Sequence, residues 1–397
     1  MKRWLFLLFF GHSLIVAAQL SVKTGVVYDS VPIPGTDKET YALYLPKSFE
    51  ASQLSPIVLI FEPAARGRIG VEAFIEVSET YGYILVCSND SKNGPYNRNF
   101  DIANRLFTHI FSRFNVYENQ IYVAGFSGGS RLATAIACLA ENITGVIACG
   151  AGFSHLPAHK PTAQNFSYVG LCGNRDMNYS EMVGVNTYLQ KLNFNHTMIT
   201  YDGDHSWPPK EQLLTAFHWL ETQGHLKGNK TLPEAELYKS FSYHYNLAAD
   251  AEKNGRLLEA MEHYVRIVKT YGSLYNIDSI QKNVLELHKR KKYNSNLKAL
   301  STAFEKELIL SKKLIERFEK DLKNPAKAKL SWWDKELQKL DKYTSTGSEM
   351  KKMVARVKNK VFASAYSRNN PMLYRSNDDQ RKFCSAICKL IYPAFGN

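Results

Sequence analysis

A serine, an aspartate and a histidine occur in this sequence where they could act together as nucleophile, acid and base. Ser127 lies in the segment 125–129, Gly-Phe-Ser-Gly-Gly, between an apolar run typical of a strand and an alanine-rich run typical of a helix. A serine hydroxyl is a weak nucleophile unless a neighbouring base activates it. Glycines on both sides allow a strand and a helix to crowd around a strained serine. The pattern therefore predicts a nucleophilic serine at a sharp turn.

An acid and a base follow this serine along the chain. Asp176 comes shortly after the apolar segment 168–172, and His205 comes shortly after the apolar segment 197–201 and before a helical pattern. If these segments are parallel strands, both side chains and Ser127 lie at the carboxyl edge of one sheet, where open α/β sheets place their sites. In a triad of this kind the histidine takes the serine proton, and the aspartate orients the imidazole.

Other residues compete for these roles. Asp202 and Asp204 lie in the same loop as His205, but their closeness in sequence favours their pointing elsewhere. Asp176 could instead cap the helix that follows it, as aspartate often does. Other histidines lie on predicted loops or loop edges, namely His155, His159 and His196. Only His205 stands at a strand end before a terminal helix, which favours it as the base.

These motifs resemble the α/β-hydrolase superfamily. The resemblance rests on Gly-Phe-Ser-Gly-Gly at 125–129, Gly-Asn-Arg-Asp at 173–176 and Gly-Asp-His-Ser-Trp at 203–207, and it covers roughly residues 26–224. The general likeness is to small, lidless members: dienelactone hydrolases, polyhydroxybutyrate-depolymerase-like esterases and the catalytic domains of prolyl-oligopeptidase-type peptidases. The resemblance implies that the serine, aspartate and histidine named above form a catalytic triad.

The resemblance also implies an oxyanion hole made of two backbone N–H groups. The first donor is Gly128, whose amide would lie at a helix N-terminus. Family members usually carry His-Gly after the third strand, whereas this chain has Glu62-Pro63. Proline has no N–H group, so we expect the second donor to be Ala64, with Ala65 as the next choice.

The elements around these motifs alternate between strands and helices. Segments 25–31 and 39–45 predict an opening antiparallel hairpin, and strands then alternate with helices up to residue 201. This alternation is typical of a mostly parallel sheet with helices on both faces. Residues 152–166 leave little room for a lid, so we expect an open, shallow site that suits small esters.

The chain has 397 residues, which is long for a single domain and favours two. We predict an α/β-hydrolase catalytic domain over 19–226, a linker over 227–233 and an all-α, repeat-like domain over 234–397. Segment 245–264 resembles one tetratricopeptide-type helical hairpin. Because the fragment 19–228 would contain the whole sheet and the triad, we expect it to fold and to retain activity.

The first eighteen residues read as a signal peptide. Lys2 and Arg3 precede a mostly apolar stretch, and Ala17-Ala18 supplies small residues for cleavage. No later segment is apolar enough to suggest a membrane span. We therefore expect a periplasmic or extracellular protein.

Cys384 and Cys388 are four residues apart on a predicted helix, where packing in a hydrophobic core is favoured over a disulfide bridge.

The net charge of +13 belongs to the C-terminal part, in which residues 231–397 hold 32 Lys and Arg against 19 Asp and Glu. Such a basic surface could bind a protein or an anionic envelope partner, or it could simply be solvated.

No nucleic-acid-binding module is recognisable, and the triad chemistry needs neither a metal nor an organic cofactor. We expect an exported serine hydrolase that cleaves carboxylic esters of small substrates through an acyl-enzyme. The alternatives are a prolyl-oligopeptidase-type peptidase and a non-catalytic binding scaffold that uses the helical domain.

Overall fold

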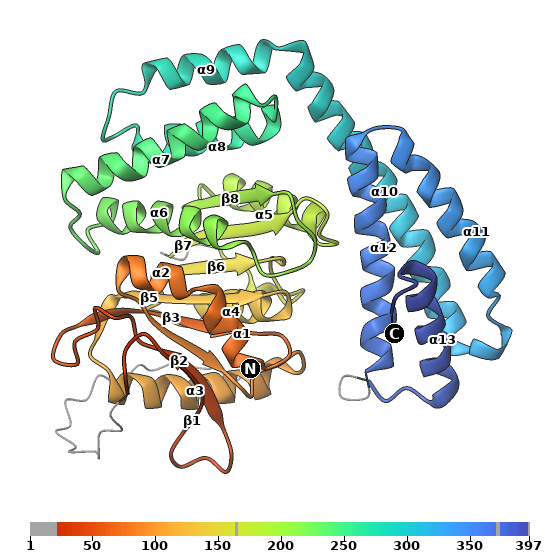
Figure 1. Ribbon diagram of the computed structural model, residues 1–397, viewed down its shortest axis with the longest axis horizontal. Coiled ribbons are helices and arrows are strands. Elements are labelled where there is room, and N and C mark those ends of the chain that lie inside the picture. Colours follow the sequence, from red (N-terminus) through yellow and green to blue (C-terminus); the bar gives the residue numbers. More distant parts are fainter. Residues whose placement is uncertain (1–21, 163–165, 371–373, 396–397) are drawn as a thin grey trace.

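The computed structural model describes residues 22–162, 166–370 and 374–395 (Figure 1). The predicted signal peptide, residues 1–18, lies outside the described residues. Within the described part, no helix is both long and apolar enough to cross a membrane.

A single eight-stranded sheet forms the first half of the chain, with the strand order β1-β2-β4-β3-β5-β6-β7-β8. Strand β2 runs antiparallel to both β1 and β4. The six strands β4, β3, β5, β6, β7 and β8 are parallel to one another. The mostly parallel sheet predicted from the sequence is therefore confirmed. The strands are β1 (Val27–Pro32), β2 (Thr40–Tyr44), β3 (Ser55–Phe61), β4 (Ile84–Ser88), β5 (Val116–Phe126), β6 (Gly145–Cys149), β7 (Ser167–Gly173) and β8 (His196–Tyr201).

Helices cover both faces of this sheet, which explains why the inner strands are continuous apolar runs. Every residue of β3, β4, β6 and β7 is buried. One core packs α3, α4 and α5 against the sheet, and a second core packs α1, α2 and α6 against the opposite face. These helices are α1 (Gly67–Ala73), α2 (Ile75–Tyr81), α3 (Tyr96–Arg113), α4 (Gly128–Leu139), α5 (Tyr179–Lys191) and α6 (Lys210–Leu226).

The chain beyond residue 233 is helical, as predicted. Two hydrophobic cores divide these helices, one formed by α7–α9 with the start of α10, and one by α10–α13. In Figure 1, α7–α9 extend the stack beyond α6 and β8, while α10–α13 form a separate bundle. The helices are α7 (Glu234–Lys253), α8 (Leu257–Tyr271), α9 (Asp278–Lys289), α10 (Lys291–Lys323), α11 (Leu330–Asp341), α12 (Ser348–Asn369) and α13 (Asp378–Ile391).

Two details of this half bear on the sequence analysis. Ala248, Ala260 and Tyr264 of the α7–α8 pair are buried in one core, while the tetratricopeptide character of the helices remains a prediction. Cys384 and Cys388 are buried as free thiols in the core of the α10–α13 bundle. The packing role that the sequence favours for these two cysteines therefore agrees with their environment.

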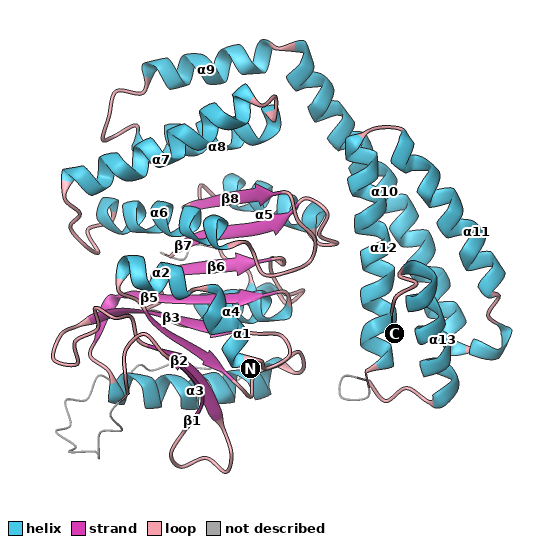
Figure 2. Ribbon diagram, in the orientation of Figure 1, coloured by secondary structure: helices cyan, strands magenta, loops and turns pink. Residues whose placement is uncertain are grey.

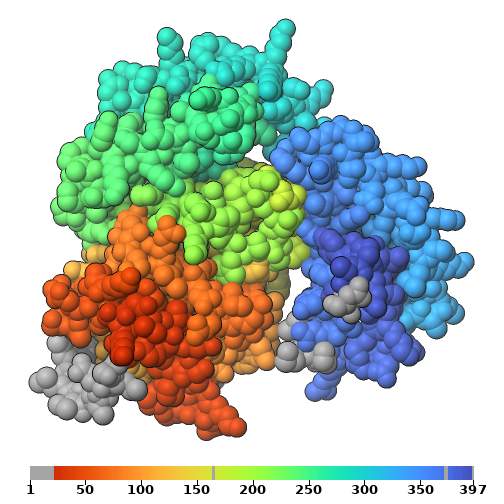
Figure 3. Space-filling view, in the orientation of Figure 1, coloured from red at the N-terminus to blue at the C-terminus, as the bar shows by residue number. Residues whose placement is uncertain are grey.

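The α10–α13 bundle stands opposite the edge at which the parallel strands end. In Figure 2 the strand arrows of β6, β7 and β8 point toward α12, and Figure 3 shows a groove between the bundle and the first half of the chain. Between residues 152 and 162 there is only a short 3-10 helix, Pro157–His159, so the lid that the sequence argued against is absent from that described stretch. The bundle flanks this edge of the sheet, and the open, shallow shape expected of the site stays a prediction.

Helix α8 covers the exposed edge of the last strand. β8 ends the sheet, so its outer edge has no strand partner. Arg266 Nη2 donates to the Met198 carbonyl at 2.6 Å, and the Thr200 N–H donates to Glu262 Oε1 at 3.0 Å. Side chains of α8 thus make the hydrogen bonds that a further strand would make, which is one way that proteins protect an edge.

This contact changes the expectation for the fragment 19–228. Without α8, the fragment leaves the β8 edge unpaired and uncovers apolar surface of α6, so we expect it to aggregate. The fragment 19–290 keeps α7–α9 and is the matched control, which we expect to be soluble. Size-exclusion chromatography of both fragments makes the comparison. A soluble, monomeric 19–228 fragment would show that α8 is dispensable for the sheet.

Candidate active site

Ser127 lies at the apex of a strained turn between β5 and α4. Its backbone φ is +53° and its ψ is −117°, a conformation that costs free energy in a residue with a side chain. The flanking glycines make the turn possible. A Cβ atom on Gly125 would lie 2.3 Å from the Gly129 backbone, and one on Gly129 would lie 1.9 Å from the Phe61 carbonyl oxygen. The structure therefore explains both glycines of the segment by close backbone approach.

The three residues expected to form a triad lie together. His205 Nε2 is 3.0 Å from Ser127 Oγ, and His205 Nδ1 is 2.8 Å from Asp176 Oδ2. Ser127 follows β5, Asp176 follows β7 and His205 follows β8, so the carboxyl ends of three parallel strands position them. Asp176 is fully buried, and its Oδ1 accepts the Asn178 N–H at 2.8 Å. This arrangement can pass a proton from the serine to a histidine whose other nitrogen is held by a buried carboxylate.

Two aromatic rings and a thiol surround this hydrogen-bonded chain. The Phe126 ring lies 4.6 Å from the His205 ring and 5.5 Å from the Trp207 ring, between centroids. Burial, followed by the charge of Asp176, raises the pKa of the Cys172 thiol well above its ordinary value. Cys172 is therefore a neutral, inert thiol beside the acid.

The rival acids have a different partner. Arg175 Nε donates to Asp204 Oδ1 at 3.1 Å, and its guanidinium also binds Asp202. These hydrogen bonds, that to Asp204 first, raise the pKa of Arg175. Both aspartates are largely exposed, with 74% and 58% of their side chains accessible. They form a solvated rim beside His205.

Two of the other histidines have hydrogen-bond partners other than Ser127. His159 Nδ1 is 2.9 Å from Ser154 Oγ, and His196 Nδ1 is 2.7 Å from the Phe194 carbonyl oxygen. Burial lowers the pKa of both imidazoles. Each has local hydrogen-bond partners of its own. No cluster of His, Cys, Asp and Glu in the described residues has the make-up of a metal site.

The N–H groups predicted as oxyanion donors differ in whether they already have a hydrogen-bond partner. Gly128 is the first residue of α4, so its N–H lies at a helix N-terminus beside Ser127. The Ala64 N–H, however, donates to Glu62 Oε2 at 2.7 Å, and the Ala65 N–H donates to the Glu62 carbonyl oxygen at 3.0 Å. These contacts contradict the expectation that Ala64, or Ala65 in its place, offers a free donor.

The comparisons with known proteins are distant and cover the first half of the chain. No protein-family model and no curated protein matches it. An S-formylglutathione hydrolase structure from Staphylococcus aureus is 14% identical, with a TM-score of 0.41, over 49% of this chain and 95% of the other. A Pyrobaculum calidifontis esterase is 13% identical, with a TM-score of 0.38, over 46% and 78%. A Pyrococcus horikoshii acylaminoacyl peptidase is 11% identical, with a TM-score of 0.38, over 50% and 41%.

The sheet itself decides the fold. An antiparallel second strand, the order β1-β2-β4-β3-β5-β6-β7-β8 and a serine turn between β5 and α4 occur together here. Residues 27–226 have the α/β-hydrolase fold.

Glu62 is where this chain departs from the usual pattern of the α/β-hydrolase fold. Its side chain is buried, and it accepts the Arg66 N–H at 3.0 Å as well as the Arg66 Nε at 3.1 Å. A buried carboxylate needs such donors to offset its lost hydration. The carboxylate therefore draws the amides of the following turn toward itself, which explains why Ala64 does not point its N–H elsewhere. Ala65 takes a positive φ of 60° within this turn.

Asn93 is a residue of the site that sequence reasoning missed. A Cβ atom on Gly128 would lie 1.7 Å from Asn93 Oδ1 and 3.2 Å from Asn93 Nδ2, so the carboxamide lies directly against Gly128. The Asn93 N–H donates to the Pro63 carbonyl oxygen at 2.8 Å, which ties this loop to the turn after β3. No motif marks Asn93, because its loop follows β4 and contacts Gly128 only through the tertiary fold.

Proposed function

We propose that this protein is a serine hydrolase that cleaves carboxylic ester bonds. The observation that carries the proposal is the hydrogen-bonded series of Ser127, His205 and Asp176 at the ends of three parallel strands. A strained serine in hydrogen-bond contact with an imidazole, which a buried carboxylate holds from the other side, is arranged for nucleophilic catalysis.

The reaction follows from this geometry. Ser127 Oγ attacks the substrate carbonyl carbon as His205 Nε2 takes the hydroxyl proton. Asp176 holds the imidazole by Nδ1 and stabilises its positive charge. The same proton then passes to the leaving alcohol, which leaves an acyl group on Ser127. Water attacks this acyl-enzyme with His205 as base, which releases the acid and restores the serine.

The negative charge that develops on the carbonyl oxygen needs donors beside Ser127. The Gly128 N–H at the start of α4 is the first. Because Ala64 and Ala65 are engaged with Glu62, we assign the second donor to the Asn93 carboxamide, which lies against Gly128. Its Nδ2 group carries N–H donors of its own, so this assignment does not require the Ala64 or Ala65 amide to leave Glu62.

Asn93→Ala is expected to lower kcat by roughly 100-fold with little change in KM, because an oxyanion donor acts mainly in the transition state. Steady-state kinetics on a small p-nitrophenyl ester measures both constants. Asn97→Ala, an exposed position on α3, is the control and should behave like the parent. Full turnover in Asn93→Ala would show that Asn93 is not the second oxyanion donor. The assignment would then go back to the backbone N–H groups of the turn after β3.

Ester hydrolysis leads over peptide hydrolysis because a triad of this kind serves both and an ester needs less activation of its leaving group. A panel of p-nitrophenyl esters and aminoacyl p-nitroanilides discriminates the two classes. Turnover of anilides alone would replace the esterase proposal with the peptidase.

A non-catalytic scaffold is the alternative of a different class, and one observation favours it. Glu62 occupies the Ala64 amide, as expected of an α/β hydrolase that has lost its oxyanion hole. Labelling with a fluorophosphonate probe separates the two, since only an activated serine reacts. A chain whose Ser127 does not label would be a scaffold.

We further propose that the protein is exported after removal of residues 1–18, with the basic helical half facing an anionic envelope component or a protein. The charged start and apolar stretch of the N-terminus support export. The excess of lysine and arginine beyond residue 230 supports the partner. N-terminal sequencing of the secreted chain should begin at Gln19, and an intact Met1 would exclude this cleavage.

A further inference from the structure

Helix α12 of the C-terminal bundle binds the loop that carries Asp176. Arg356 is fully buried, and its Nη1 donates to the Asn174 carbonyl oxygen at 2.8 Å. One turn further along α12, Asn359 Nδ2 donates to the Arg175 carbonyl oxygen at 3.3 Å. The two peptide carbonyls that precede Asp176 are therefore both bound by one helix from the other half of the chain.

Arg356 is itself held from several sides. Its Nε donates to Glu307 Oε2 of α10 at 2.5 Å, and Glu307 is likewise buried. The guanidinium carbon lies 5.5 Å from the centre of the Tyr179 ring and 5.3 Å from that of the Phe304 ring, within the range of cation–π contacts. Ser180 Oγ donates to Glu307 Oε1 at 3.1 Å. The pair thus joins α10 and α12 to the acid loop and to the start of α5.

A buried ion pair of this kind is a costly way to hold two helices together. Apolar side chains of similar volume usually stabilise such an interface at least as well. What an apolar pair cannot do is bind a main-chain carbonyl in a fixed direction. Arginine does this with a planar set of donors and keeps its charge at every working pH. The cost of burying this ion pair is explained if the site needs the Asn174 carbonyl to point in one direction. That direction sets the path of the loop.

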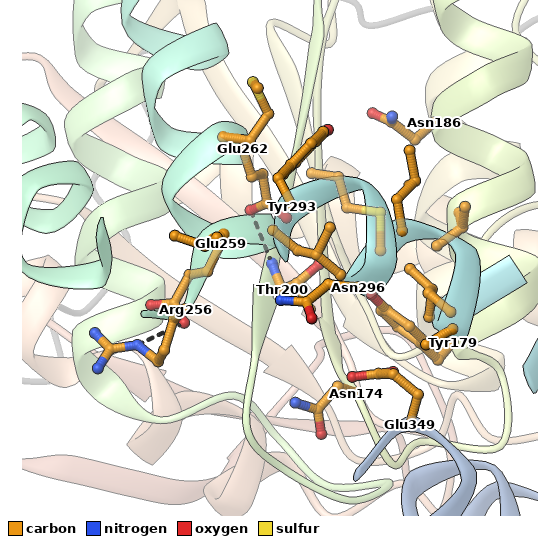
Figure 4. Close-up of a pocket in the computed structure, with 18 of the residues that line it drawn as sticks. Asn174, Tyr179, Asn186, Thr200, Arg256, Glu259, Glu262, Tyr293, Asn296 and Glu349 are labelled. Carbon is orange, nitrogen blue, oxygen red and sulfur yellow. Dashed lines mark hydrogen bonds and ion pairs between the residues drawn. The ribbon is translucent and has the colours of Figure 1, made fainter. Parts of the chain in front are cut away.

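Part of the loop borders open space instead of packed side chains. Asn174 and Tyr179 border a cavity of about 1270 Å³, whose other walls come mainly from β8, α5, α8, α10 and the start of α12 (Figure 4). A close-packed interior would fix the loop by contact alone. Beside a cavity it depends on hydrogen bonds, and those from Arg356 and Asn359 lie within two residues of Asp176.

We infer that Arg356 and Glu307 form a positioning pair, which holds the loop Asn174-Arg175-Asp176 so that Asp176 Oδ2 faces His205. This inference rests on the proposed function. Asp176 Oδ2 lies 2.8 Å from His205 Nδ1, and the Asp176 N–H donates to the Gly173 carbonyl oxygen at 3.0 Å. The Asn174 and Arg175 N–H groups donate to the Tyr201 and Gly203 carbonyl oxygens at 2.8 and 2.9 Å, so the N–H side of the loop is held by the end of β8 and the segment after it. The carbonyl side of the same two residues is held by α12.

The test is a double-mutant cycle with the acid. Arg356→Met in the full chain should lower kcat on a small ester by about 100-fold with little change in KM, because a small misplacement of a catalytic group costs that order of rate. In an Asp176→Asn background the same change should cost almost nothing more, because the group that it positions is already disabled. A merely structural role would lower the rate by the same factor in both backgrounds.

Two further variants keep the test decisive. Arg356→Met leaves the buried Glu307 carboxylate without its cationic partner, which lowers the stability of the fold. The double variant Arg356→Met, Glu307→Met removes both charges and avoids this loss of stability. Asn359→Ala removes only the donor to Arg175, and its smaller loss should also vanish in the Asp176→Asn background. Arg368→Met is the matched control, since it breaks another contact between α12 and α10, the pair with Glu319 at 3.5 Å, without touching the loop.

The outcomes separate the inference from the proposed function. If the parent chain has no Ser127-dependent turnover, the proposed function is wrong and there is no acid to position. If the parent is active and both Arg356→Met and the double variant keep full kcat, the positioning role alone is wrong. Equal loss in Arg368→Met would mean that the bundle acts through general stability.

Discussion

Replacing Ser127 with alanine is expected to remove hydrolysis almost completely, by something on the order of a millionfold in turnover. In the proposed mechanism the hydroxyl oxygen forms the acyl-enzyme, and it gives up its proton through its contact with His205 Nε2 at 3.0 Å. His205→Ala should cost about as much, because nucleophile and base act as one unit. Turnover of a p-nitrophenyl ester, with fluorophosphonate labelling of the same samples, measures both effects.

Ser130→Ala is the matched control for this experiment. Ser130 is also buried near the start of α4, but its hydroxyl donates to the Ala151 carbonyl oxygen at 2.5 Å. Its loss should cost some stability and leave labelling and turnover near the parent level. Labelling that persists in Ser127→Ala would show that another nucleophile reacts, and the proposed mechanism would then be wrong.

The fold and the grouping of the triad residues could be predicted because local patterns encode them. Apolar runs of strand length, each followed by a helical period, imply parallel strands whose carboxyl ends share an edge. Ser127 is marked by its two glycines, whose missing side chains the structure explains by backbone approaches of 2.3 and 1.9 Å. Asp176 and His205 are then found as the polar residues that follow later strands.

The oxyanion donors could not be predicted in the same way. Proline at position 63 correctly excludes its own amide, but the direction of the Ala64 N–H depends on the Glu62 side chain, which folds back and accepts it. A glutamate after a buried strand reads in the sequence as an exposed, solvated residue. Its burial here is a property of the tertiary fold, as is the contact between Asn93 and Gly128.

The same limit applies to the role of the helical half. Arg356 and Asn174 are 182 residues apart, and nothing in the amphipathic pattern of α12 distinguishes Arg356 from the solvated basic residues around it. The sequence alone therefore favours two independent halves. The structure instead links them at the β8 edge through Arg266 and at the acid loop through Arg356.

Asp176→Asn is expected to lower kcat by roughly 10,000-fold, the loss typical when the triad acid becomes an amide. The reason lies in the fixed surroundings of this fully buried side chain. Its Oδ1 accepts the Asn178 N–H at 2.8 Å, so the amide oxygen of an asparagine must take that place. The amide nitrogen then faces His205 Nδ1 and donates to it. The imidazole is forced to carry its proton on Nε2, where it can no longer accept the Ser127 proton.

Asp204→Asn is the control that identifies the acid. Asp204 is one residue from His205 but pairs with Arg175 at an exposed rim, so its substitution should change kcat little. Steady-state kinetics of the two variants, with circular dichroism to verify folding, gives the comparison. A harmless Asp176→Asn together with a severe Asp204→Asn would transfer the acid role to the rim. The burial of Asp176 and its contact of 2.8 Å with the imidazole argue for the opposite result, because a fixed carboxylate that accepts from Nδ1 keeps the proton of His205 on that nitrogen.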